Sequence, residues 1–190
     1  ARAILLPLAL GRTPMQALHL DAEQRYDSIR KSALRAVQNA LADNNTSDIT
    51  LRVIDQAALT ASKVWETSAI RRVDWDWLAS YPSFRFRHPK RFELAIWQGP
   101  RLISLSLGRP TYHGTAMRLD FVESQPVDQG KRPKTFRLVT AALQVYAELL
   151  GAREIRIMNP INDAVKQYYT SYGFTYHPKG DFLSKLISEV

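Results

Sequence analysis

Lysine and arginine side chains gather in two short segments of this 190-residue chain. The segments are "FRFRHPKRF", residues 84–92, and "GKRPKTFR", residues 130–137. Together with a formal net charge of +8, they favour polyanionic partners such as phosphorylated cofactors, nucleic acid or acidic lipid surfaces. The alternative is that these side chains are simply solvated, as is usual for Lys and Arg in polar loops.

The stretch "NPINDAVKQYYTSYGF", residues 159–174, has the spacing of a short helix that carries chemistry on one face. Asn162 stands near the start of that helix, where its side chain caps the helix or reaches a ligand. Tyr169 follows seven residues later, on the same face as Asn162. Gly173 permits a left-handed turn out of the helix. Tyr169 is therefore either a phenol presented to a ligand or an amphipathic core residue.

The composition argues against several kinds of site and against a membrane span. The chain has no cysteine, which excludes disulfides, cysteine metal sites and thiol nucleophiles, and fits a reducing, cytoplasmic compartment. Its four scattered histidines show no ligand spacing, so we expect no metal site. No apolar run approaches the roughly 20 residues of a membrane span. The segment "AILLPLAL", residues 3–10, is interpreted as a buried strand or packed arm rather than an export signal.

Hydrophobic periodicity predicts the elements that must position these residues. Helices are expected over 13–42, 56–70, 136–151 and the stretch that begins at 159. Strands are expected over 48–55, 91–98, 101–109, 115–126 and 152–160, with one or two more within 174–187. Pro160 should hold Asn159 extended and so end the strand over 152–160. Antiparallel strands that lead into a β-α-β-α-β half indicate the α/β class, with a mixed α+β sheet and helices on its faces.

An apolar stripe follows the first helix, at spacings of three and four residues. Its members are Met15, Leu18, Ala22, Tyr26, Ile29, Ala33, Val37 and Leu41. The stripe either packs on the core or forms the seam of a homodimer. Core packing is favoured, because the pattern is not strict enough for a coiled coil.

The C-terminal half resembles the GCN5-related N-acetyltransferase (GNAT) superfamily. The resemblance rests on the element order, on "YAELLGAREIRIMNP", and on the motif of Asn162, Val165, Tyr169, Gly173 and Phe174. It covers roughly residues 48–188. We therefore expect an N-terminal arm and long amphipathic helix over 1–47, followed by a GNAT-like acyltransferase domain over 48–190.

The resemblance implies an N-acyltransferase that takes acetyl-CoA, or another acyl-CoA, as co-substrate. An amine of the acceptor, a small molecule or a protein, would attack the thioester directly. Tyr169 would donate a proton to the leaving thiolate, and Glu123 or Asp120 would act as base, directly or through water. The two carboxylates are three residues apart, so they face opposite sides of a regular strand unless a bulge intervenes. Glu123 is preferred because it is nearer the strand's C-terminal end, and the alternative for both is a solvated strand carboxylate.

The phosphate-binding loop departs from the family's glycine-rich pattern. Lys131 stands at its first position, while Lys134 and Phe136 replace the glycines and Pro133 removes one N–H donor. One interpretation is that side chains hold the cofactor instead, with help from the helix dipole. The residues concerned are Lys131, Arg132, Lys134, Thr135, Arg137, Asn159 and Asn162. The other interpretation is that the loop no longer binds coenzyme A and that the domain is a binding or regulatory module.

An aromatic segment, residues 72–89, stands where the family varies to recognise its acceptor. Pro82 and Pro89 interrupt it, which indicates a loop or short helix. Trp75, Trp77 and Tyr81 would wall an acceptor pocket and Asp76 would hold a cationic amine, or the segment is a hydrophobic plug over the sheet. A third hypothesis, from a different class, is a nucleic-acid-binding protein that uses the two basic segments, although no nucleic-acid motif is present.

Overall fold

The computed structural model describes residues 14–43, 48–127 and 135–187. The elements of these residues follow in chain order. They are α1 (Pro14–Asp43), β1 (Ile49–Arg52), α2 (Gln56–Glu66), α3 (Trp77–Arg87), β2 (Phe92–Gln98), β3 (Arg101–Pro110), β4 (Ala116–Ser124), α4 (Phe136–Leu149), β5 (Glu154–Met158), α5 (Asp163–Thr170), β6 (Thr175–His177), a 3-10 turn (Pro178–Gly180) and β7 (Phe182–Leu186). The segment "AILLPLAL" lies outside the described residues.

Seven described strands form one sheet in the order β1-β2-β3-β4-β5-β7-β6. β4 and β5 pair in parallel, and every other neighbouring pair is antiparallel. The parallel pair requires a crossover, which α4 supplies. The mixed α+β sheet predicted from the sequence is confirmed.

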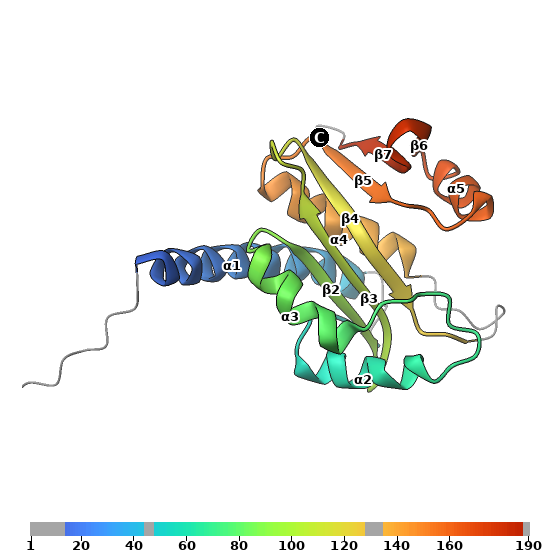
Figure 1. Cartoon of the computed structure of the whole chain (residues 1–190), viewed down its shortest axis with the longest axis horizontal. Coiled ribbons are helices and arrows are strands. Elements are labelled where there is room, and N and C mark those ends of the chain that lie inside the picture. Colours follow the sequence, from blue (N-terminus) through green and yellow to red (C-terminus); the bar gives the residue numbers. More distant parts are fainter. Residues whose placement is uncertain (1–13, 44–47, 128–134, 188–190) are drawn as a thin grey trace, which may run out of the picture.

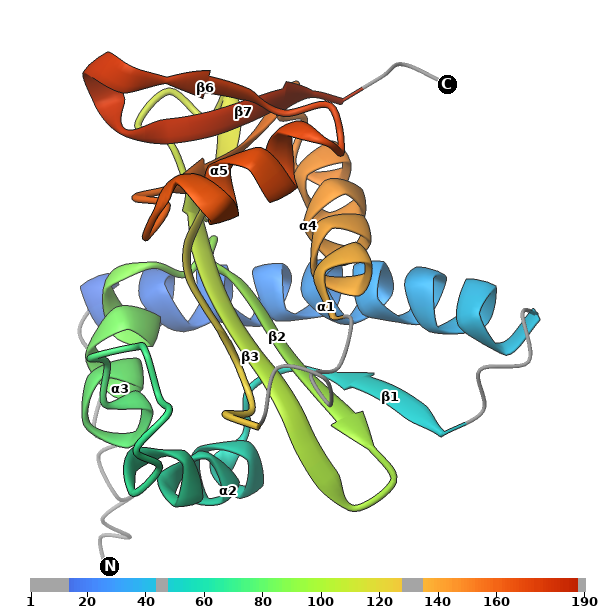
Figure 2. The ribbon, with the colours of Figure 1, turned by 90° about the vertical axis from the view of Figure 1, so that its right-hand side faces the viewer.

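Helices cover both faces of the sheet (Figures 1 and 2). α1 and α4 lie on one face and share a core cluster with β2, β4 and β5, which includes Leu94, Met117 and Leu143. α2 and α3 lie on the other face, where Leu59, Trp77 and Leu105 belong to a second cluster. Among the described residues, no helix is both long enough and apolar enough to cross a membrane.

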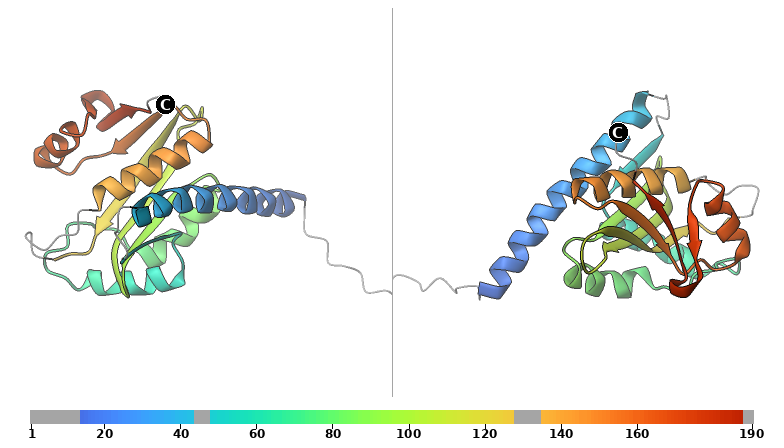
Figure 3. Two further views of the ribbon diagram at one scale, coloured as in Figure 1. Left: turned by 180° about the vertical axis from the view of Figure 1, so that it is seen from behind. Right: turned by 90° about the horizontal axis from the view of Figure 1, so that it is seen from above.

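The apolar stripe of α1 is only partly buried. Tyr26, Ala33 and Val37 are buried, and Ile29 and Leu41 pack at the margin of the same cluster. Leu18, however, is 70% exposed. Leu18 does not pack on the core of the single chain, because the first turns of α1 project beyond the sheet (Figures 1 and 3), and the seam of a homodimer stays a prediction there.

Buried ion pairs fasten α1 to β2. The Arg91 guanidinium donates to both carboxylate oxygens of Glu23 at 2.8 and 2.7 Å, and its Nε donates to Glu93 at 2.8 Å. Arg30 of α1 reaches the Pro89 carbonyl at 2.8 Å and lies 3.4 Å from Glu93. Buried charges are tolerated only when they are paired and hydrogen-bonded, so this network fixes α1 against residues 89–93.

α3 continues through Pro82, although the sequence analysis expected this proline to interrupt the aromatic segment. Asp76 caps the helix by accepting a hydrogen bond from the Ala79 amide at 2.9 Å. Trp77, Tyr81 and Phe84 are all buried against the sheet. Burial of three large aromatic side chains outweighs the one backbone hydrogen bond that Pro82 cannot make.

Candidate functional site

A cleft opens where β4 and β5 diverge. Their parallel pairing covers only residues 116–119 and 154–157, although β4 continues to Ser124. The cleft has a volume of about 440 Å³ and is lined by the end of β4, the residues after β5, α5 and residues 70–74. Backbone groups of β4 that face this gap have no partner strand, so they are available to a ligand.

A bulge in β4 brings two carboxylates to the cleft. Leu107 pairs with Phe121 but Gly108 pairs with Leu119, so Asp120 is the extra residue. Gly108 makes the bulge compatible with β3, because a Cβ there would meet the Arg118 carbonyl oxygen at 2.0 Å. Asp120 and Glu123 both line the cleft, which a regular strand would not allow.

Glu123 is 3% exposed and strongly bound by its neighbours. Its Oε1 accepts from Arg71 Nε at 2.7 Å, and its Oε2 accepts from Arg71 Nη2 at 3.1 Å and from Trp77 Nε1 at 2.6 Å. The hydrogen bond to Glu123 is also the main reason why the pKa of Arg71 is raised. Glu123 therefore holds Arg71 in place at the wall of the cleft and ties it to the buried Trp77.

Asp120 makes fewer hydrogen bonds than Glu123. Its Oδ1 accepts from the Arg118 guanidinium, and Arg109 Nε lies 3.5 Å from Oδ2. Within the described residues, the buried Oδ2 takes part in no hydrogen bond. Oδ2 is therefore engaged only by the Arg109 ion pair, whereas both oxygens of Glu123 accept hydrogen bonds.

Tyr169 lies in the cleft lining, and burial raises the pKa of its hydroxyl to about 12. Its ring packs 4.8 Å from the Phe136 ring and 6.0 Å from the Phe174 ring, measured between centroids. The neighbouring Tyr168 is 44% exposed and is not part of the lining. Tyr169 is thus a phenol that stays protonated at neutral pH, in the lining of the same cleft as Asp120 and Glu123.

The two asparagines after β5 shape the floor of the cleft, and both belong to its lining. Asn162 caps α5 by accepting from the Val165 amide at 2.9 Å. Asn159 has a φ of 49°, so it is left-handed rather than extended as Pro160 led us to expect. Asparagine tolerates this conformation better than most residues. The backbone N–H of Asn159 donates to the Asp181 carbonyl at 2.8 Å.

The phosphate-binding residues expected from the sequence are described only in part. Lys131, Arg132 and Lys134 lie outside the described residues. Thr135 precedes α4, is 4% exposed, and its hydroxyl contacts the Ser124 hydroxyl at 3.0 Å instead of capping the helix. Arg137 is exposed, and its guanidinium lies 5.7 Å from the centre of the Tyr172 ring.

The aromatic segment behaves as a plug over the sheet. Trp77 and Tyr81 are 1% and 4% exposed, and Tyr81 donates to the Ile54 carbonyl at 3.0 Å. Trp75 stacks on Phe121 with a centroid distance of 3.8 Å. Asp76 caps α3, as described above. None of the four expected acceptor residues is among those that line the cleft.

Sequence reasoning missed Arg71, which lines the cleft and binds Glu123. It follows Ile70 in a run of two arginines that precedes the aromatic segment. Two adjacent arginines at the edge of the aromatic segment were the only available signal, because Arg71 and Glu123 are 52 residues apart in the sequence.

Comparison with solved structures finds proteins with a similar fold. The spermidine N-acetyltransferase SpeG of Vibrio cholerae, as a variant, aligns with 16% identity and a TM-score of 0.55, over 75% of this chain and 95% of its own. The ribosomal-protein-alanine N-acetyltransferase of Escherichia coli aligns with 13% identity and a TM-score of 0.54, over 75% and 96%. YncA of Salmonella typhimurium, solved with its cofactor acetyl-CoA, aligns with 18% identity and a TM-score of 0.52, over 76% and 96%.

The chain has the GNAT acetyltransferase fold. No protein-family model and no curated protein matches the sequence. At these identities the likeness establishes the fold alone, so the chemistry of this GNAT-fold protein must be argued from its own cleft. About a quarter of the chain lies outside the shared fold, whereas the three compared structures are covered almost completely.

Proposed function

We propose that the protein is an acyl-CoA-dependent N-acyltransferase that uses acetyl-CoA and an amine acceptor. The observation that carries this proposal is the cleft between the diverging strands β4 and β5, with Tyr169, Asp120 and Glu123 in its lining. The amine nitrogen attacks the thioester carbonyl carbon, the C–N bond forms and the C–S bond breaks. The net proton movement is from the amine to the departing thiolate.

The cleft fits the arm of coenzyme A. Unpaired backbone groups of residues 120–124 can bind its amides and polarise the thioester carbonyl. The contact between Ser124 and Thr135 brings the start of α4 beside the end of β4. Among the described residues no side chain caps α4, which leaves the N–H groups of Phe136 and Arg137 available to bind phosphate. Lys131, Arg132, Lys134 and Arg137 would add charge that replaces the missing glycine cradle.

The proton path uses Asp120 and Tyr169. Asp120 Oδ2 has no hydrogen bond among the described residues, so it is the better acceptor for the amine proton, directly or through water. Glu123, whose two oxygens already bind Arg71 and Trp77, is a positioning residue in this proposal. Tyr169 donates to the thiolate. The acceptor carries a free amine, as spermidine does in the case of SpeG.

Calorimetric titration with acetyl-CoA tests binding, and substitutions test chemistry. Tyr169→Phe keeps the ring and should lower turnover by about 10²–10⁴-fold while acetyl-CoA affinity stays unchanged. Tyr168→Phe, one residue away and outside the cleft lining, is the control and should act like wild type. Asp120→Asn should raise the pH needed for activity, whereas Glu123→Gln should lower stability as well as rate.

Two results would contradict the proposal. If acetyl-CoA does not bind, the protein is a GNAT-fold binding or regulatory module that has lost its co-substrate. If acetyl-CoA binds but Tyr169→Phe retains full turnover, Tyr169 is a core residue only. The double variant Lys131→Glu/Lys134→Glu tests the loop separately from the cleft. If the loop holds the phosphates of acetyl-CoA, this variant should bind acetyl-CoA more weakly, and the loss of affinity should depend on the salt concentration.

A further inference from the structure

A basic groove lies apart from the cleft lining, between α1, the turn after α3 and the hairpin that joins β3 to β4. It has a volume of about 640 Å³. Among the residues that the structure describes, five cationic side chains line it and no carboxylate does. They are Arg25, Arg87, Lys90, Arg109 and Arg118. A concave site with this much charge of one sign attracts anions strongly, because the surrounding protein focuses the field.

Three of these cations have no acidic partner. Asp120 pairs with Arg118 and lies 3.5 Å from Arg109. Throughout the described ranges, by contrast, no carboxylate is within salt-bridge distance of Arg25, Arg87 or Lys90. Their charge is therefore not neutralised within the described molecule.

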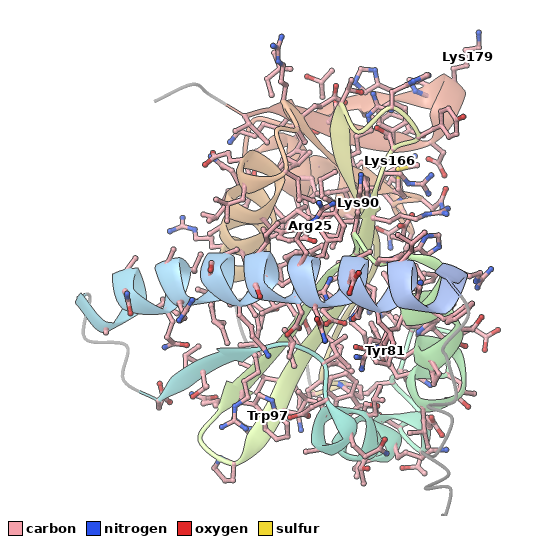
Figure 4. All side chains as sticks on the ribbon, turned by 90° about the vertical axis from the view of Figure 1, so that its left-hand side faces the viewer. Arg25, Tyr81, Lys90, Trp97, Lys166 and Lys179 are labelled. Carbon is pink, nitrogen blue, oxygen red and sulfur yellow. The ribbon has the colours of Figure 1, made fainter. Side chains whose placement is uncertain are left out.

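The groove is held in shape before any ligand arrives. The pairing of Glu23 with Arg91 fixes α1 against β2, and Arg30 binds the Pro89 carbonyl. As a result Arg25 and Lys90 lie on the same tyrosine ring, 4.8 and 5.5 Å from the centre of Tyr26. Figure 4 shows Arg25 and Lys90 side by side above α1. A site that is already organised binds with less loss of side-chain entropy.

An aromatic side chain completes the groove. Tyr112, in the β3–β4 hairpin, lines the groove and is 98% exposed. An exposed aromatic face beside arginines suits a base that stacks while its phosphates bind the cations. A bilayer surface is broad and would meet protruding side chains, whereas these cations line a concave site. We propose that the groove binds a segment of single-stranded nucleic acid.

The proposal is independent of the acyltransferase assignment, and its test keeps the two apart. Anisotropy of a labelled single-stranded oligonucleotide measures affinity over a series of salt concentrations. The logarithm of the wild-type affinity should fall linearly with the logarithm of salt, by about 0.7 per phosphate contact. The double variant Arg25→Glu/Lys90→Glu should bind at least about tenfold more weakly, with a slope smaller by about 1.4.

The matched control is Arg101→Glu/Lys179→Glu, which makes the same change in net charge. Arg101 stands at the opposite end of β3 from Arg109, and Lys179 lies far from Arg25 and Lys90 (Figure 4). All four side chains are exposed, so folding should persist, which melting curves check. Acetyl-CoA affinity should be the same in both double variants. Tyr112→Ala should weaken oligonucleotide binding by about tenfold without changing the affinity for inorganic pyrophosphate.

Three results would overturn the proposal. Equal loss of affinity in both double variants would mean that net charge alone attracts the oligonucleotide. Equal wild-type affinity for pyrophosphate and for the oligonucleotide would make the groove a site for small phosphates. Displacement of the oligonucleotide by vesicles of anionic lipid, but not by neutral vesicles, would assign the groove to a membrane surface.

Discussion

Burial of the Tyr169 hydroxyl determines the pH range over which it can donate a proton. Its pKa is raised to about 12, from an ordinary value near 10. The difference in tyrosinate absorbance between wild type and Tyr169→Phe should therefore titrate near pH 12. Because the folded pKa is raised, the stabilising contribution is complete below pH 10 and is lost between pH 10 and pH 12. A titration near pH 10 would show that water reaches the hydroxyl freely, and that the cleft does not shield it.

The proposed roles of the β4 carboxylates depend on the contacts of each individual side chain. Glu123 and Asp120 both line the cleft, yet Arg71 and Trp77 bind both oxygens of Glu123, whereas Asp120 Oδ2 accepts no hydrogen bond among the described residues and lies 3.5 Å from Arg109 Nε. Its position nearer the C-terminal end of the strand favoured Glu123 as the base in the sequence analysis. Hydrogen bonding favours Asp120 as the proposed base, because its Oδ2 accepts no hydrogen bond among the described residues.

The β4 bulge depends on one glycine in the neighbouring strand. A Cβ at position 108 would meet the Arg118 carbonyl oxygen at 2.0 Å and the Leu119 Cα at 3.3 Å. Since both contacts are backbone atoms, β4 would have to shift. Gly108→Ala should cost about 1–3 kcal/mol of unfolding free energy, as overpacking does, and should weaken acetyl-CoA binding as well. Urea denaturation and calorimetry measure the two effects.

Ser106→Ala on the same strand is the control for that substitution. Ser106 is fully buried, and its hydroxyl has no hydrogen-bond partner among the described residues. Removing this hydroxyl should leave stability unchanged or raise it, because an unsatisfied polar group is lost. If Gly108→Ala were as stable as Ser106→Ala and bound acetyl-CoA equally well, the bulge would not need a glycine.

The first turns of α1 contribute little to the core, whereas its later turns are buried. Leu34 is 5% exposed and belongs to the core cluster with α4, whereas Leu18 is 70% exposed. Leu34→Ala should therefore lower the unfolding free energy by about 2–5 kcal/mol, and Leu18→Ala should change it by less than about 0.5 kcal/mol. Equal effects, measured by urea denaturation, would mean that α1 does not pack as described.

Sequence periodicity predicted the order of the strands and of four helices along the chain, because each has a clear apolar face. It placed α3 ambiguously, since Pro82 signals a break locally while the burial of Trp77 and Tyr81 is a tertiary effect. The motif around Tyr169 identified one wall of the cleft. Arg71 could not be found in this way, because its partner Glu123 is distant in sequence and only folding brings them together.

At the scale of the whole molecule, the helix before the shared fold is part of the structure rather than an appendage. The sequence predicts a boundary at residue 47, where the resemblance to the GNAT superfamily begins. Across that boundary, Ala33, Leu34 and Val37 share one core cluster with α4 and the sheet. Glu23 also supplies the carboxylate that pairs with the buried Arg91. We therefore expect residues 1–47 and 48–190 to fold as one cooperative unit.

Removal of residues 1–47 tests this expectation. The truncated chain would expose the apolar surface of α4 and leave Arg91 without Glu23, and loss of one member of a buried ion pair typically costs about 3–5 kcal/mol. Because a small domain has a total stability of about 5–15 kcal/mol, the fragment should be unfolded or aggregated. Circular dichroism and thermal melting measure this, with full-length Leu18→Ala as the folded reference. A fragment that melts cooperatively and binds acetyl-CoA like the full chain would show instead that α1 is a separable arm, whose own task is to build the basic groove.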